Sequence, residues 1–193
     1  MAHGGRNPRA GLSADEFTAR FQTGARVLWT LAEGLLGDPT EAEDLCQEAF
    51  LAAYAKRDQF EHGTNFLAWM GRFIRHLAAN EQRKRTRRQT ESADPVQLDQ
   101  DRAARSEAGE NSQAEEQTTL FEPEQFDARL AAGLRELGEV PRSCFLLRTL
   151  RELSYAEIAA LLELPEGTAM SHVHRARLAL REKLAPTLDG VRP

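Results

Sequence analysis

Hydrophobic residues in the first half of the chain recur every three to four positions, which is the spacing of one buried face of an α-helix. The first helix is expected to begin at Ser13, which forms a capping-box pattern with Glu16, and to end at Gly37-Asp38-Pro39. A second capping-box pattern, Thr40 with Glu43, predicts that the next helix begins there. The two apolar stripes consist of Phe17, Phe21, Leu28, Leu31 and Leu35, and then of Ala42, Leu45, Ala49 and Ala53.

A third helix is expected to begin near Asn65, after a loop that contains a glycine. At about 100° per residue, its arginines Arg72, Arg75 and Arg83 fall opposite the apolar stripe. Residues 69–88 contain seven Arg or Lys residues and one acid, so this helix is strongly basic. The apolar stripe consists of Phe66, Trp69, Met70, Phe73, Ile74 and Leu77.

The basic helix has the chemistry of a nucleic-acid surface. Each cation placed near a phosphate releases counterions and adds affinity without sequence preference. Aromatic rings beside a basic face suit the unstacked bases of single-stranded DNA, and the loop and helix start supply Phe60, Phe66 and Trp69. Two alternatives stay open: a basic helix end that the helix dipole favours, and core positions for Phe66 and Trp69.

The second helix is acidic where the third is basic. Acids at the start of a helix complement its dipole, which accounts for them without any partner. Beside Leu45 and Phe50 they also form a candidate docking surface for a basic protein. The polar residues of its first two turns are Glu41, Glu43, Asp44, Gln47 and Glu48.

Residues 89–125 are polar and acidic, and they include almost no large apolar side chains. Such a segment buries too little apolar area to offset the entropy of ordering it, so a flexible linker between two independently moving domains is expected. A partly helical connector around residues 99–110 is the alternative. The predicted organisation is a disordered tail at 1–12, a domain at 13–88, the linker at 89–125, a second domain at 126–186 and a tail at 187–193.

The second domain shows four helical segments. Phe126 begins the first and Pro141 opens the second, while Ser154 with Glu157 caps a short third helix. Residues 163–167 form a turn before the last helix, whose buried stripe is Ala169, Val173, Ala176, Leu180 and Leu184. Since no stretch alternates strongly enough to be a strand, the predicted fold class is all-α.

The segment from Ser154 to about Lys183 has the form of a helix-turn-helix. Arginine can recognise guanine in the major groove, while Ser or Thr holds phosphate. An ordinary three-helix bundle is the alternative, and metal binding by the two histidines is disfavoured because their rings point apart. The residues opposite the buried stripe are Thr168, Ser171, His174 and Arg175, with His172 and Arg177 at the flanks.

Composition narrows the class of protein. The net charge of −5 argues against nucleic acid on average, but DNA responds to local patches. Cys46 and Cys144 lack metal-ligand spacing, so we expect small core residues, with a thiol sensor as the alternative. We find no phosphate-binding loop, no nucleophile–base pair, no signal peptide and no membrane span. A cytoplasmic protein is expected, with no membrane insertion, enzymatic activity, metal or cofactor.

Several motifs resemble sigma-70-type RNA polymerase sigma factors. Leu-Ser-Tyr-Ala-Glu-Ile-Ala at 153–159 and Gly-Thr-Ala-Met-Ser-His-Val-His-Arg-Ala-Arg at 167–177 look like region 4. Ala-Glu-Asp-Leu-Cys-Gln-Glu-Ala-Phe at 42–50 looks like region 2.2, and Phe-Leu-Ala-Trp-Met-Gly-Arg-Phe-Ile at 66–74 looks like region 2.3 running into 2.4. With regions 2 and 4 only, the chain resembles the extracytoplasmic-function (ECF) group.

The resemblance implies promoter-specific transcription initiation with core RNA polymerase. Region 2.2 would dock on the clamp coiled coil of the β′ subunit through Asp44, Leu45, Gln47, Glu48 and Phe50. The melted −10 element would lie against Phe60, Asn65, Trp69, Arg72, Arg75, His76 and Arg83. The −35 duplex would be contacted by Thr168, Ser171, His172, His174, Arg175 and Arg177. The β flap and an anti-sigma factor are further candidate partners.

Two positions depart from the family pattern. The family usually has Val-Lys or Val-Arg where this chain has Ala169-Met170, which removes one expected basic contact. It often has Asn where this chain has His76, at a position that helps to select a flipped base. The promoter sequence is therefore not implied. The competing hypothesis is a stand-alone helix-turn-helix regulator that binds duplex DNA as a symmetric dimer without polymerase.

Overall fold

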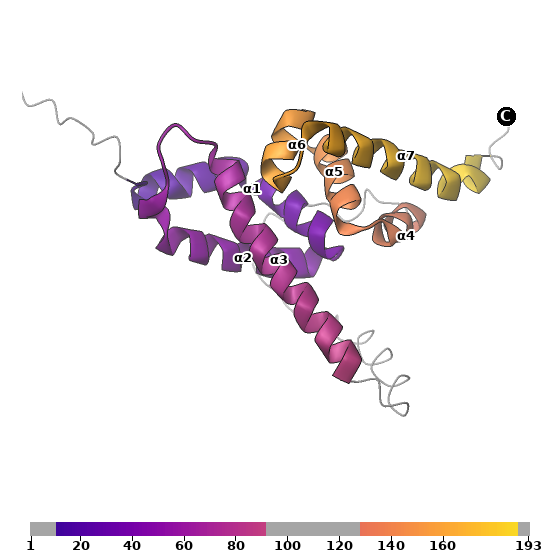
Figure 1. The fold of residues 1–193 in the computed structure, drawn as a ribbon, viewed down its shortest axis with the longest axis horizontal. Coiled ribbons are helices and arrows are strands. Elements are labelled where there is room, and N and C mark those ends of the chain that lie inside the picture. The colour runs from indigo at the N-terminus through magenta and orange to yellow at the C-terminus, as the bar shows by residue number, and fades with distance from the viewer. Residues whose placement is uncertain (1–10, 92–127, 189–193) are drawn as a thin grey trace, which may run out of the picture.

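The computed structural model describes residues 11–91 and 128–188, and every regular element in these ranges is helical, as predicted (Figure 1). The elements are α1 (Ala14–Leu36), α2 (Pro39–Ala55), the 3-10 helix η1 (Arg57–Gln59), α3 (Phe66–Glu91), α4 (Ala128–Glu136), α5 (Glu139–Leu150), α6 (Tyr155–Leu162) and α7 (Glu166–Leu188). We call α1–α3 the N-terminal domain and α4–α7 the C-terminal domain. Nearly all of the predicted linker, and residues 1–10 and 189–193 of the predicted tails, lie outside the described residues.

The ends of α1 follow the sequence signals. Ser13 Oγ accepts from the backbone N–H of Glu16 at 3.2 Å, and the Glu16 carboxylate accepts from Ser13 N at 3.2 Å, which completes the capping box. The helix ends at Gly37, whose φ of 78° is left-handed and whose N–H bonds to Glu33 O at 2.7 Å. Glycine adopts this conformation without a side-chain penalty, so it terminates the helix.

The predicted start of α2 at Thr40 is wrong. Asp38 is the N-cap, and its Oδ1 accepts from the N–H groups of Thr40 at 2.9 Å and Glu41 at 3.2 Å. Pro39 follows in the first turn, where its missing N–H costs nothing and its fixed φ suits a helix. Asp38 and Pro39 together therefore outweigh the capping-box pattern of Thr40 with Glu43.

Helix boundaries in the C-terminal domain shift by two residues. α5 begins at Glu139, ahead of Pro141, because a proline is tolerated in the first turn. α7 begins at Glu166 rather than after Gly167, and the N–H of Thr168 bonds to Pro165 O at 2.9 Å. The turn between α6 and α7 is therefore shorter than predicted.

The N-terminal domain is organised around a cluster of aromatic rings. Phe17 of α1 is fully buried, and its ring meets the rings of Phe50, Tyr54 and Phe66 edge-on at 5.3–5.6 Å between centroids. Edge-to-face packing of this kind adds stabilisation beyond the buried area. This cluster joins all three helices of the domain.

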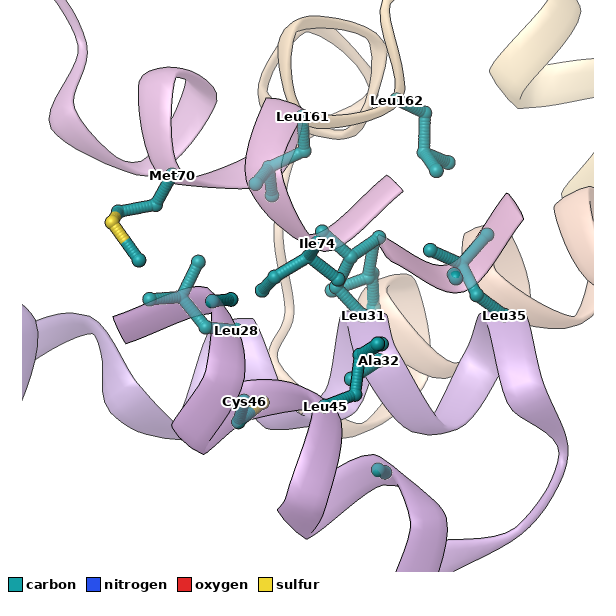
Figure 2. Packing of buried hydrophobic residues seen from close by; sticks show 14 of the residues in the cluster. Leu28, Leu31, Ala32, Leu35, Leu45, Cys46, Met70, Ile74, Leu161 and Leu162 are labelled. Carbon is teal, nitrogen blue, oxygen red and sulfur yellow. The ribbon is translucent and has the colours of Figure 1, made fainter. Parts of the chain in front are cut away.

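The two domains are packed against each other, and one buried cluster runs through both. α5 lies on α1, and α6 lies on α3 (Figure 1). Figure 2 shows Leu161 and Leu162 of α6 entering the same apolar core as Ile74 of α3. A flexible linker predicted independent domains, but in this structure they share a core.

Candidate nucleic-acid and polymerase interfaces

The basic helix α3 turns two of its arginines towards the C-terminal domain. Arg72 Nε lies 3.0 Å and Arg75 Nη2 lies 2.7 Å from Glu163 Oε1, at the end of α6. Arg75 Nη1 also donates to the carbonyl oxygen of Leu161. The Arg75 side chain is only 18% exposed, against 70% for Arg72. Arg72 and Arg75 are both predicted to contact DNA, and in this structure both have partners within the chain.

The remaining cations lie towards the free end of α3, which extends beyond the other helices in Figure 1. Arg83 Nη1 donates to Asn80 Oδ1 at 3.0 Å, and Arg85 pairs with Glu41 of α2. Arg88 and His76 are exposed. This end of the helix therefore combines exposed cations with Lys84 and Arg85, which pair with Glu81 and Glu41.

The predicted aromatic surface is largely internal. Phe60 is 2% exposed and Phe66 is 7% exposed, and their rings lie 5.8 Å apart. Trp69 is partly buried, 5.4 Å from the Phe60 ring and 4.9 Å from that of Phe73. In this arrangement no base can stack on Phe60, because the domain uses that ring to close its core. Asn65 is exposed, and its Oδ1 accepts from Ala68 N at 3.1 Å at the start of α3.

The helix-turn-helix consists of α6 and α7. Ser154 and Glu157 form the predicted capping box, with Ser154 N donating to Glu157 Oε2 at 2.8 Å. Ile158 and Leu161 bury this helix against the rest of the molecule. The turn begins at Glu163, whose φ of 52° is left-handed.

α7 divides into a buried face and an exposed face. Val173 and Ala176 are on the buried face, at 1% and 0% exposure. Thr168 and His172 are partly buried, and burial, followed by the charge of Arg175, lowers the pKa of His172. The exposed predicted contacts are Ser171, His174, Arg175 and Arg177, and Met170 beside them is 53% exposed.

The acidic surface of α2 borders an apolar hollow of about 290 Å³. Asp44, Gln47 and Glu48 are exposed on it, and Phe50 is partly buried. Leu45 is only 3% exposed, so it supports this surface from inside and cannot contact a partner directly. The hollow is lined by Phe21, Trp29, Cys46, Gln47, Phe50 and Leu51.

Sequence patterns did not identify Leu51, which is 67% exposed beside this hollow. Its only signal is a large apolar residue off the buried stripe of α2. They also did not identify Glu163, because an acid in a turn is unremarkable until its partner is known.

Both cysteines are core residues. Cys46 is 1% and Cys144 is 0% exposed, and burial raises the pKa of their thiols to about 12 and about 11. The thiolate is the reactive form, so the structure favours the packing interpretation over the sensor. Within residues 11–91 and 128–188, no three His, Cys, Asp or Glu side chains are grouped to hold a metal ion. No helix of the described part combines the length and apolar character that crossing a membrane requires.

Comparison with solved structures finds the same architecture. The sigma factor RpoE of Bartonella quintana, solved with the anti-sigma factor NepR, matches with a TM-score of 0.62 and 26% identity over 89% of this chain and 98% of that one. CnrH, solved with the cytosolic domain of CnrY, matches in fold with a TM-score of 0.57 and 23% identity, over 93% of this chain and 92% of that one.

Comparison of sequences identifies the family. Residues 21–88 match the model of Sigma-70 region 2, and residues 127–180 match that of Sigma-70, region 4. The ECF RNA polymerase sigma factor SigW of Bacillus subtilis is 30% identical over 161 residues, which are 81% of this chain and 82% of the relative. EcfG of Rhodopseudomonas palustris is 34% identical over 153 residues, 79% and 76% of the two chains. The chain therefore belongs to the ECF group of sigma-70 family RNA polymerase sigma factors.

Proposed function

We propose that this sigma factor binds core RNA polymerase through α2, the melted −10 strand through α3 and the −35 duplex through α7. Promoter-specific transcription initiation follows from the family, and the assignment of each contact to these residues is the proposal. The family relationship does not favour the stand-alone regulator.

The two faces of α7 carry the proposal. Ser171, His174 and Arg175 are exposed on one side, while Ala169 and Val173 anchor the other side in the core. A helix held in this way can enter a major groove with polar side chains directed at base edges. A well-placed arginine–guanine pair contributes about 1–3 kcal/mol of discrimination.

The −10 contact is assigned to α3. Arg72, Arg75, His76 and Arg83 share a basic helix, and the partly buried Trp69 lies one turn before Arg72. Unstacking DNA costs a few kcal/mol per step, and stacking on an aromatic ring returns about 1–3 kcal/mol per base. Since Phe60 and Phe66 are enclosed, Trp69 is the aromatic residue that we assign to base contact.

The polymerase contact is assigned to the acidic rim and apolar hollow of α2. Asp44 and Glu48 supply charge, while Phe50 and Leu51 supply apolar area. A basic amphipathic helix pair, such as the clamp coiled coil of β′, complements this surface in both respects. The β flap would contact the C-terminal domain. A protein that acts with RNA polymerase would work in the cytoplasm, and this location is part of the proposal.

An anti-sigma partner is a further proposal. The two structural relatives were solved with anti-sigma factor NepR and with the cytosolic domain of CnrY, respectively. The present chain shares their architecture, which supports a partner of the same class.

Polymerase binding distinguishes a sigma factor from a lone regulator. We expect Asp44→Ala with Glu48→Ala to weaken binding to core polymerase by roughly tenfold, because charge complementarity at an interface is lost. The control pair Asp15→Ala with Glu152→Ala removes two other exposed acids and should bind normally. Binding can be measured by fluorescence anisotropy, with run-off transcription in parallel. Wild-type protein that does not bind core polymerase would contradict the proposal.

A further inference from the structure

Two arginines of α3 that we assign to DNA contact pair with the C-terminal end of α6, and Arg75, at 18% exposure, is largely covered by it. Glu163 lies within 3.0 Å of Arg72 and 2.7 Å of Arg75, and Arg75 also donates to Leu161 O. Leu161 itself is buried in the shared core (Figure 2). One end of a short helix therefore pairs with the charge of both arginines, and it accepts from Arg72 Nε and from Arg75.

This end of α6 presents negatively charged oxygen atoms to the arginines, as a phosphate group would. The last carbonyls of a helix lack intrahelical partners and carry a partial negative charge. Glu163 adds a full one. Burial opposes its ionisation, but hydrogen bonds and charges from Arg75 and Arg72 outweigh burial and lower the pKa of Glu163. Carboxylate and carbonyl oxygens of the same chain therefore pair with two arginine side chains that could bind phosphate oxygens.

Glu163 occupies an unfavourable backbone position. Its φ of 52° and ψ of 51° are left-handed, a conformation in which helices usually end with glycine. A side chain is disfavoured there, so the α6–α7 turn alone would be better served by glycine. Glutamate at this position forms the ion pairs with Arg72 and Arg75, which glycine could not form.

Small residues allow the domains to approach closely. A Cβ atom on Gly71 would lie 2.9 Å from Leu161 O, and one on Gly34 would lie 2.5 Å from Ser143 Cα. Both glycines lie inside helices, where alanine would be favoured. Arg142 adds hydrogen bonds to Gly34 O at 2.7 Å and Leu35 O at 3.1 Å. Both domains therefore contribute residues that fit this contact: glycines from the N-terminal domain and Arg142 from the C-terminal domain.

The contact cannot persist on a promoter. Elements centred near −35 and −10 are about 25 base pairs apart, which is roughly 85 Å at 3.4 Å per base pair. We propose that the packed arrangement is a self-inhibited state, in which Glu163 and the end of α6 occupy Arg72 and Arg75 in place of DNA. The inference rests on the proposed role of α3, and opening requires that polymerase or DNA displace α6.

Two glycine substitutions provide a matched test. Glu163→Gly removes the carboxylate and suits the left-handed backbone, so the turn should stay folded. Glu152→Gly is the control, because Glu152 is also a glutamate with a positive φ, of 56°, but is exposed and outside this contact. Both variants relieve the same backbone conformation and remove the same charge. Only the first removes the carboxylate that pairs with Arg72 and Arg75.

The distance between the two domains is measured on the full chain. Spin labels on Gln59→Cys and Arg181→Cys are at exposed positions in different domains, whereas Cys46 and Cys144 are too buried to react. Double electron–electron resonance should give a narrow distance distribution for wild type and the same distribution for Glu152→Gly. For Glu163→Gly it should become broader and longer. Equal distributions for both variants would overturn the self-inhibited state and leave the transcription test of the proposed function unaffected.

Measurement of DNA binding distinguishes the self-inhibited state from the proposed −10 contact of α3. A fluorescent single-stranded DNA of mixed sequence should bind Glu163→Gly roughly tenfold more tightly than Glu152→Gly. The dependence of log K on log salt should become steeper by about 1.4, from two released cations at about 0.7 each. If the labels separate but affinity and salt dependence do not change, α3 is not the DNA site, and both the proposed −10 contact and this inference fail.

Discussion

Glu33 of α1 sits where the two domains meet, and its charge is disfavoured there. Burial raises its pKa to about 7, although Arg151 and Arg142 of the C-terminal domain oppose the shift and Asp38 adds to it. Arg142 is itself 7% exposed and Arg151 Nε donates to Thr30 Oγ1 at 2.8 Å. The carboxyl group is thus desolvated by the same contact that supplies its cations.

A pH dependence follows from this shift. The folded chain holds the Glu33 proton more tightly than the unfolded chain between about pH 4.5 and 7, so this residue lowers the free energy of unfolding as the pH rises through that range. Glu33→Gln removes the effect. Its urea midpoint should exceed that of wild type by more at pH 7.5 than at pH 5. Parallel midpoints at the two pH values would contradict the assignment.

Individual residues differ in how far sequence could place them. Ser171, His174 and Arg175 were predictable because helical periodicity separates them from Val173 and Ala176. Phe60 and Leu45 were not, since a family resemblance assigns a role without saying whether the side chain is accessible. Glu163 could not be found, because its partners lie in a helix 91 and 88 positions away along the chain.

At the scale of elements, the start of α2 allows a direct comparison of two caps. Asp38→Ala should lower the free energy of unfolding by about 1 kcal/mol, because the N–H groups of Thr40 and Glu41 lose their acceptor. Thr40→Ala should cost much less, since Thr40 is not the cap. Urea denaturation of both variants measures the difference. A larger loss for Thr40→Ala would restore the capping box that the sequence pattern suggests.

Helix identity and helix boundary have different physical origins. The identities of α1, α3 and α7 follow from long apolar stripes, which many residues determine together. A boundary depends on one or two local hydrogen bonds, and several residues often compete for them. Near Asp38-Pro39-Thr40 three candidate signals overlap, so only the structure shows which side chain accepts the N–H groups.

At the scale of the whole molecule, the sequence pattern predicts two helical domains but not their contact. An acidic segment between them indicates separation, because it cannot fold by itself. The domains approach most closely at two glycines, where Gly34 faces Ser143 and Gly71 faces Leu161 O. Glycines in helix interiors are the sequence signal of a close contact between helices. They can be interpreted only when the structure shows which residue lies against them.

Gly34 connects this contact to the shape of the chain in solution. In a free helix Gly34→Ala would be stabilising by about 0.5–1 kcal/mol. In the packed chain the new Cβ would lie 2.5 Å from the backbone of Ser143, so α5 must move away from α1. We therefore expect a larger radius of gyration by small-angle scattering with undiminished helical circular dichroism. Gly167→Ala, where a Cβ meets nothing within 4 Å, should stay compact. If Gly34→Ala kept the wild-type radius, the domains would not be packed in solution in the way that occupies Arg72 and Arg75.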